Sequence, residues 1–195
     1  MDNKFLTFIK PYLSFIDNGD IFRKPFSWLY VILAIINLIL PLYFFFIALD
    51  NGIFSTSAKL IVVFLLIWII IAFAGWVSFQ LWWDRKSKVI EISAESDEFV
   101  ATPVFSHLIQ TIGEWLGTWI GIVGFGTALL TTIILGSSGS SGYYFPRQFG
   151  INLVGTGWLS VVLMPILGLL IIVATRFLAE LFRAIISIAN NTRKN

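Results

Sequence analysis

Cysteine is absent from this chain, and histidine occurs only at position 107. Without cysteine there are no disulfides, Cys-ligated zinc sites, iron–sulfur clusters or thiol nucleophiles. His107 alone is a poor metal candidate, because no second histidine or cysteine completes a site. The sequence also lacks a phosphate-binding loop, a dinucleotide fingerprint, an HExxH pair and a nucleophile elbow. We therefore expect a protein that is not an enzyme and that needs no cofactor and no metal.

Charged residues are scarce as well. Only 12% of the 195 residues are charged, whereas 57% are hydrophobic, and the mean hydropathy is +0.88. A soluble domain has about 25% charged residues, and its surface must stay wet, so it cannot hide this much apolar side chain. The composition predicts an integral membrane protein. The net charge of +2 is too small to indicate binding of nucleic acid.

Four apolar runs are long enough to cross a bilayer. They cover residues 25–49, 60–83, 115–135 and 153–175. A helix needs about 20 residues to cross about 30 Å of hydrocarbon, and lipid offers no partner for free backbone groups, so the spans must be helical. The expected fold is all-α: a four-helix transmembrane bundle, with residues 25–195 as one membrane domain whose last helix extends into the cytoplasm.

Lysine and arginine gather on one side of the expected membrane. Eleven of the thirteen lie in the N-terminal tail, in the loop between the second and third spans, or in the C-terminal tail, and only Lys59 and Arg147 lie opposite. The positive-inside rule then places both termini in the cytoplasm. Aromatic residues with a polar edge stand near the span ends and are interpreted as interfacial anchors: Trp28, Tyr30, Trp82, Trp83, Trp115, Trp119 and Trp158.

Two segments have apolar residues at helical spacing and are expected to lie on the membrane surface as amphipathic helices. One lies in the cytoplasmic N-terminal segment 1–24, and the other is Pro103–Gly113, just before the third span. If the second segment continues as one helix to Leu135, that helix is longer than the hydrocarbon is thick, so the segment either projects from it or bends along its surface. The acidic stretch 91–98 is interpreted as a solvated connector, and docking of a basic partner is the alternative.

Glycines recur on one side of the third span. Gly113, Gly117 and Gly121 are four residues apart, and Gly124 falls near the same helix face. Small residues let helix backbones approach closely in lipid, where there is no hydrophobic drive for helices to associate. We expect this face to pack against the other helices of the same chain, and self-association is the alternative.

Polar side chains follow the same helix. His107, Gln110, Thr111, Glu114 and Thr118 have offsets that place them on one helical side. A carboxylate at the entrance of a span is costly unless it is paired, hydrated or protonated. This stripe is either a proton or cation relay or a vestibule for a polar substrate, or else an interfacial face wetted by headgroups and water.

A charged pattern follows the fourth span. Arg176, Glu180 and Arg183 are spaced as a ladder of helix ion pairs. The same charges are on the cytoplasmic side with Glu114, so an Arg176–Glu114 contact is a further hypothesis, and contact with lipid phosphate is the alternative. In the first span, Asn37 is expected to make an interhelical hydrogen bond.

Two stretches of the chain resemble known sequences. Residues 21–30 enter the first span, and residues 176–183, followed by 188–192, leave the last. Together they resemble a family of small bacterial inner-membrane proteins of unknown function. The resemblance implies a bacterial inner-membrane setting, and it supplies no activity.

The function expected from these patterns is that of a non-enzymatic accessory or scaffold component of the inner membrane. The alternative is a small oligomeric channel or transporter that uses His107 and Glu114. The expected partners are the lipid bilayer and either a protein partner or further copies of the chain.

Overall fold

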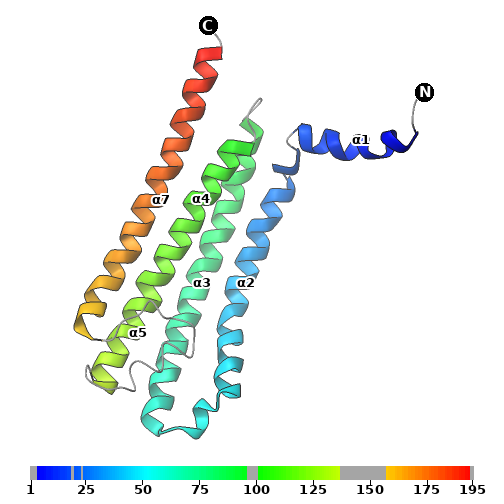
Figure 1. The fold of residues 1–195 in the computed structure, drawn as a ribbon. Coiled ribbons are helices and arrows are strands. Elements are labelled where there is room, and N and C mark those ends of the chain that lie inside the picture. Colours follow the sequence, from blue (N-terminus) through cyan, green and yellow to red (C-terminus); the bar gives the residue numbers. More distant parts are fainter. Residues whose placement is uncertain (1–3, 19, 23, 96–100, 137–156, 194–195) are drawn as a thin grey trace.

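The computed structural model describes residues 4–18, 20–22, 24–95, 101–136 and 157–193. These residues form helices and contain no β-strand, so the predicted all-α class is confirmed for them. Four long helical rods lie side by side, and rods that neighbour each other in sequence run in opposite directions (Figure 1).

The rods are built from the following elements. The first part of the chain forms α1 (Lys4–Asp17), the 3₁₀ turn η1 (Asp20–Phe22) and α2 (Lys24–Asp50). A second 3₁₀ turn, η2 (Ile53–Ser55), leads to α3 (Ala58–Glu95). The third rod consists of α4 (Ala101–Trp119), the π-helical turn η3 (Ile120–Gly124), α5 (Phe125–Leu130) and the π-helical turn η4 (Thr131–Leu135). The last rod is α7 (Trp158–Arg193).

Four helices are long and apolar enough to cross a membrane, as the sequence predicts. They are Asp20–Asp50, Ala58–Ile92, Ala101–Leu135 and Trp158–Ile188. Each contains one of the predicted spans, except that residues 153–156 of the fourth lie outside the described residues, as do residues 96–98 of the acidic stretch.

The rods are longer than the apolar runs that predict them. The second helix continues past residue 83 to Glu95, because the charged residues that follow are compatible with a helix. Lys88 and Asp84 lie one turn apart and form an ion pair of 3.5 Å, an arrangement that supports an exposed helix. The end of an apolar run therefore marks a change of surroundings and not the end of the helix.

The two predicted surface segments have different outcomes. The N-terminal one forms α1, which leaves the end of the bundle sideways and leaves Ile9, Tyr12 and Leu13 exposed (Figure 1). Residues 103–113 do not bend away as a separate surface helix. This segment is the first part of α4, as expected for the straight alternative, and Val104 and Thr111 are buried between helices, because its polar side chains find partners on neighbouring rods.

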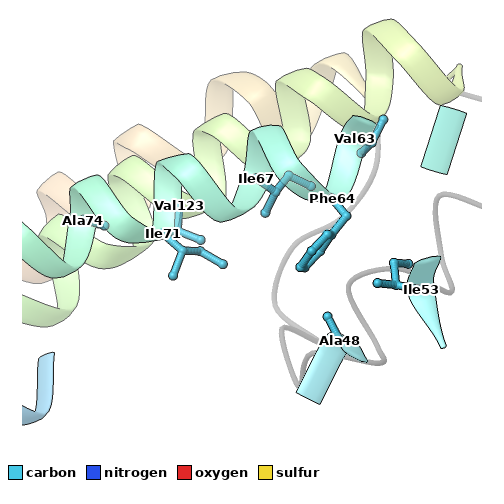
Figure 2. Packing of buried hydrophobic residues seen from close by; sticks show 8 residues of the cluster. All are labelled: Ala48, Ile53, Val63, Phe64, Ile67, Ile71, Ala74 and Val123. Carbon is cyan, nitrogen blue, oxygen red and sulfur yellow. The ribbon is translucent and has the colours of Figure 1, made fainter. Parts of the chain in front are cut away.

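The bundle consists of two antiparallel pairs, α2 with α3 and the third rod with α7, joined by the contact of α3 with α4. An apolar core fills the half of the bundle that contains η2. Figure 2 shows how side chains of α3 point toward α2, η2 and η3 there. This cluster consists of Ala48, Ile53, Val63, Phe64, Ile67, Ile71, Ala74 and Val123. The turn that leads into η2 requires Gly52, whose φ of 67° is left-handed.

The opposite half of the bundle carries α1, the C-terminal part of α3, the start of α4 and the C-terminal part of α7 (Figure 1). Most of the basic residues belong to these segments. A second apolar cluster lies here, built around the buried Tyr30, Trp82, Val89 and Val104. This is also the half in which the polar residues of α4 lie.

Candidate functional site

The carboxylate of Glu114 is the centre of a polar cluster that joins three helices. Glu114 is only 4% exposed. Arg85 of α3 donates from Nε to Oε2 at 2.9 Å, and Arg176 of α7 donates from Nη2 and Nε to Oε1 at 2.8 and 3.0 Å. Gln110, one turn earlier on α4, adds a hydrogen bond of 2.8 Å to Oε1. The hypothesised Arg176–Glu114 contact is therefore present, and Arg85 is a second partner.

This arrangement removes the main cost of burying an ionised carboxylate. Such a group is strongly destabilising when unpaired, whereas charge-assisted hydrogen bonds compensate for the lost water. The side chain of Arg85 is 17% exposed and that of Arg176 is 53% exposed. One guanidinium is therefore largely enclosed with Glu114, while the other reaches it from the surface.

A second group of bonds continues from this cluster along the contact of α4 with α7. Arg183 donates to the amide oxygen of Gln110 and to Ser106 Oγ, the latter at 3.3 Å. Ser106 in turn donates to the backbone carbonyl of Ala179 at 2.8 Å. These bonds pair side chains of α4 with the last turns of α7, so they fix the register of the two helices.

The predicted charge ladder on α7 is not formed as a set of pairs within the helix. Arg176 and Arg183 reach across to α4, and among the described residues no ion pair involves Glu180, which is exposed. The buried carboxylate of Glu114 and the amide of Gln110 compete successfully, because exposed helix pairs contribute only a few tenths of a kcal/mol.

His107 faces a different helix from Glu114. Its Nδ1 lies 3.1 Å from the hydroxyl of Tyr30 on α2, and both side chains are buried. Thr111 donates to the backbone carbonyl of His107 at 2.8 Å and so stays within its own helix. The ring of Trp82 packs against Tyr30 with centroids 5.2 Å apart. His107 thereby connects α4 to α2 in the same half of the bundle.

Asn37 makes the interhelical bonds that were expected, and its partners are tryptophans. Its Oδ1 accepts hydrogen bonds from Trp115 Nε1 at 2.7 Å and from Trp119 Nε1 at 3.2 Å. Its Nδ2 donates to the carbonyl of Leu33 at 2.8 Å. Asn37 is 2% exposed, so a polar contact between α2 and α4 lies deep in the bundle.

Several aromatic residues predicted as interfacial anchors belong to the interior. Tyr30 and Trp82 are 0% and 1% exposed, and Trp115 and Trp119 are bound to Asn37. For Tyr30 and Trp82 the anchor interpretation is wrong, because neighbouring helices cover both side chains, which pack in one cluster with Val104 of α4. The remaining three residues are exposed on the helix surfaces: Trp28, Trp83 and Trp158.

Three of the four predicted packing glycines of the third rod, Gly113, Gly117 and Gly124, lie against α7. A Cβ on Gly113 would collide with Thr175, and one on Gly117 would collide with the backbone carbonyl of Gly168. A Cβ on Gly124 would lie 3.1 Å from Met164. Gly121 differs, because a Cβ there would meet nothing within 4 Å.

The structure therefore brings the stripe residues into the bundle but divides them among its neighbours. His107, Thr111 and Glu114 are buried, and Gln110 and Thr118 are half-buried. Thr118 donates to the carbonyl of Glu114 at 2.6 Å. The interpretation as an interfacial face wetted by headgroups does not fit this burial. Among the described residues no group of three or more His, Cys, Asp and Glu side chains is placed to hold a metal ion.

Sequence reasoning missed most of the partners in this cluster. In the sequence, Arg85 is one of several basic residues that indicate orientation, and no pattern marks Tyr30 as a polar partner of α4 or Ser106 as a partner of α7. Helical periodicity tells which residues share a face, but it does not tell which helix lies opposite.

Comparisons of this chain with known protein families, with curated proteins and with solved structures find no match.

Proposed function

We propose that this protein is a non-enzymatic accessory or scaffold component of a bacterial inner membrane. The observation that carries the proposal is the bonding of Glu114, whose carboxylate accepts four N–H groups from three residues. A carboxylate engaged in this way holds three helices in a fixed arrangement. It is poorly suited to take up and release protons or cations, because each uptake would break several charge-assisted bonds.

The sequence supports the proposed sidedness and setting. Eleven of thirteen basic residues precede residue 25, follow residue 175, or lie at 85–88 in the C-terminal part of α3, which supports a cytoplasmic location for both termini. The exposed apolar residues of α1 support a position of this helix along the cytoplasmic surface of the membrane. The resemblance of residues 21–30, 176–183 and 188–192 to a family of small bacterial inner-membrane proteins supports that membrane in particular.

The sidedness is tested by cysteine labelling, which is clean because the chain contains no cysteine. Ser55 and Ser187 are exposed at opposite ends of the bundle. A membrane-impermeant maleimide applied to intact spheroplasts is expected to label S55C and to leave S187C unlabelled until the membrane is opened. Labelling of S187C in intact spheroplasts would contradict the proposed orientation.

The alternative, a channel or transporter, requires a polar path that reaches the other side. The stripe begins at His107 and ends at Thr118, and the next buried polar side chain of the third rod is Thr127, nine residues later. The side chains between these two threonines are apolar, apart from Nε1 of Trp119, which is bonded to Asn37. This apolar stretch favours a role of the stripe in helix contacts. If the stripe is nevertheless a relay, proton or cation flux into proteoliposomes should depend on Glu114 and His107, and loss of flux in the E114Q/H107A double variant would support transport.

The accessory role is tested by purification of the chain from its native membrane in a mild detergent. A second protein in a fixed ratio is expected to accompany it. E180Q is the matched control for E114Q, because Glu180 is an exposed glutamate of the same region. Recovery of the wild-type chain without any other protein, together with flux that E114Q abolishes and E180Q does not, would overturn the proposal.

A further inference from the structure

An apolar stripe follows the outer side of α7 over nearly its whole length. Between Trp158 and the level of Glu114 it consists of five exposed residues, Leu159, Leu163, Ile166, Leu170 and Val173. Beyond that level it continues through Phe177, Leu181, Ala184 and Ile188. Successive members are three or four residues apart, the spacing of a helix face that packs along another helix.

The stripe points away from the rest of the bundle. Ala179 faces α4, where it is fully buried and its carbonyl accepts the Ser106 bond. At 100° per residue, Leu181 and Ile188 lie about 180° from Ala179 around the helix. Their exposed fractions are 44% and 66%. Among the described residues nothing covers this side of α7.

The stripe is also longer than a membrane is thick. Arg85, Glu114 and Arg176 are in contact, so they lie at one level of the bundle, and we call these three residues the charged layer. Ionised side chains are rare in the hydrocarbon centre, so this layer marks the cytoplasmic edge of the proposed span. Residues 177–193 continue about 25 Å past it, and the end of α7 lies beyond the ends of α3 and α4 (Figure 1).

Lipid therefore covers only part of the stripe. Leu181 and Ile188 lie beyond the charged layer, where apolar surface in contact with water is unfavourable, at about 25 cal/mol per Å². An occupant of the whole stripe must cross the membrane beside α7 and must also extend into the cytoplasm. The α7 helix of a second copy is as long as the stripe, and its own exposed apolar residues have the same spacing of three or four. It also runs parallel to the first, since both copies enter the membrane in the same orientation.

We propose that the outer stripe of α7 is a homodimer interface, in which α7 of a second copy packs in parallel along it around a two-fold axis normal to the membrane. The inference rests on the proposed membrane insertion and orientation. Two-fold symmetry brings each stripe residue near its own counterpart. In such a pair, residues on the stripe come within disulfide distance, which requires Cα atoms less than about 7 Å apart.

The proposal is tested by disulfide formation in native membranes between copies that carry one cysteine each. I188C lies on the stripe, and the matched control S187C lies about 100° away on the same exposed turn. We expect I188C to form a dimer under mild oxidation and S187C to remain monomeric. Failure of I188C to cross-link, or equal cross-linking of both variants, would overturn the proposal.

A second measurement separates a dimer from coverage by lipid. Native mass spectrometry in mild detergent is expected to show a dimer for the wild type and for S187E, and a monomer for I188E and L181E with unchanged helicity by circular dichroism. A wild-type monomer, or quenching of a fluorophore at position 188 by nitroxide-labelled lipid, would contradict the dimer. The accessory role would stand in that case if a different protein still co-purified in a fixed ratio.

Discussion

The two halves of the bundle are held together by different chemistry. In the half with α1, buried polar side chains bond from one helix to another, as Glu114 does to α3 and α7 and His107 does to α2. In the half with η2, the core is apolar (Figure 2), and the hydrogen bonds between rods involve the backbone: Trp68 Nε1 donates to the carbonyl of Pro41 at 2.9 Å, and the backbone N–H of Gly157 donates to Thr132 Oγ1 at 3.0 Å. Bonds between two side chains specify which helices meet and in which register, whereas a backbone carbonyl is present at every residue.

The largest effect is expected from removal of the carboxylate at the centre of the polar half. E114A leaves the largely enclosed Arg85 with only the exposed Asp84, 3.7 Å away, as an ion-pair partner, and we expect it to lower the free energy of unfolding by about 3 kcal/mol. The measurement is reversible unfolding in mixed micelles, followed by circular dichroism. The matched control E180A removes an exposed glutamate and is expected to change stability by less than about 0.5 kcal/mol. Equal losses in both variants would show that the charged layer has no special role.

A somewhat smaller effect is expected where α4 and α7 approach most closely. In G117A the new methyl group collides with the backbone of Gly168, and we expect a loss of about 2 kcal/mol from overpacking. G121A is the matched control on the same helix, because its methyl group meets nothing within 4 Å. That substitution is expected to be neutral or to stabilise slightly through its better helix propensity. Thermal melting in mild detergent compares the two, and the reverse order of melting temperatures would contradict the packing.

The smallest of these effects is expected at the bond between α2 and α4. N37A leaves Trp115 and Trp119 without their shared acceptor, at an expected cost of about 1 kcal/mol. Asn51 is the control, because its side chain is exposed and bonds only to the carbonyl of Ile47 in its own helix. The same unfolding experiment tests both, with tryptophan fluorescence as a second signal. If N37A and N51A were equally mild, Asn37 would have no role between helices.

The positions of the four long helices could be predicted from the sequence, because each contains a long apolar run, within residues 25–49, 60–83, 115–135 and 153–175. Their ends could not, since Asp84 and Lys88 continue a helix as readily as they begin a loop. The Arg176–Glu114 contact was within reach of sequence reasoning because both charges follow the pattern that gathers the basic residues at one end of the bundle.

The contacts of Arg85 and Tyr30 with α4 could not be predicted in the same way. Arg85 looks like any basic residue that follows a span, and Tyr30 looks like any interfacial tyrosine. Only the packing of α3 and α2 against α4 decides that Arg85 meets Glu114 and that Tyr30 meets His107. A single sequence specifies helix faces well, but it does not specify which faces are neighbours.

The most direct test of the account is a double-mutant cycle between Glu114 and Arg176. The free energy of unfolding is measured for the wild type, E114Q, R176Q and E114Q/R176Q under one set of micelle conditions. If the ion pair joins α4 to α7, the two substitutions are coupled by about 1 kcal/mol or more. Effects that add to within about 0.3 kcal/mol would mean that the two residues act independently and would contradict the central role assigned to Glu114.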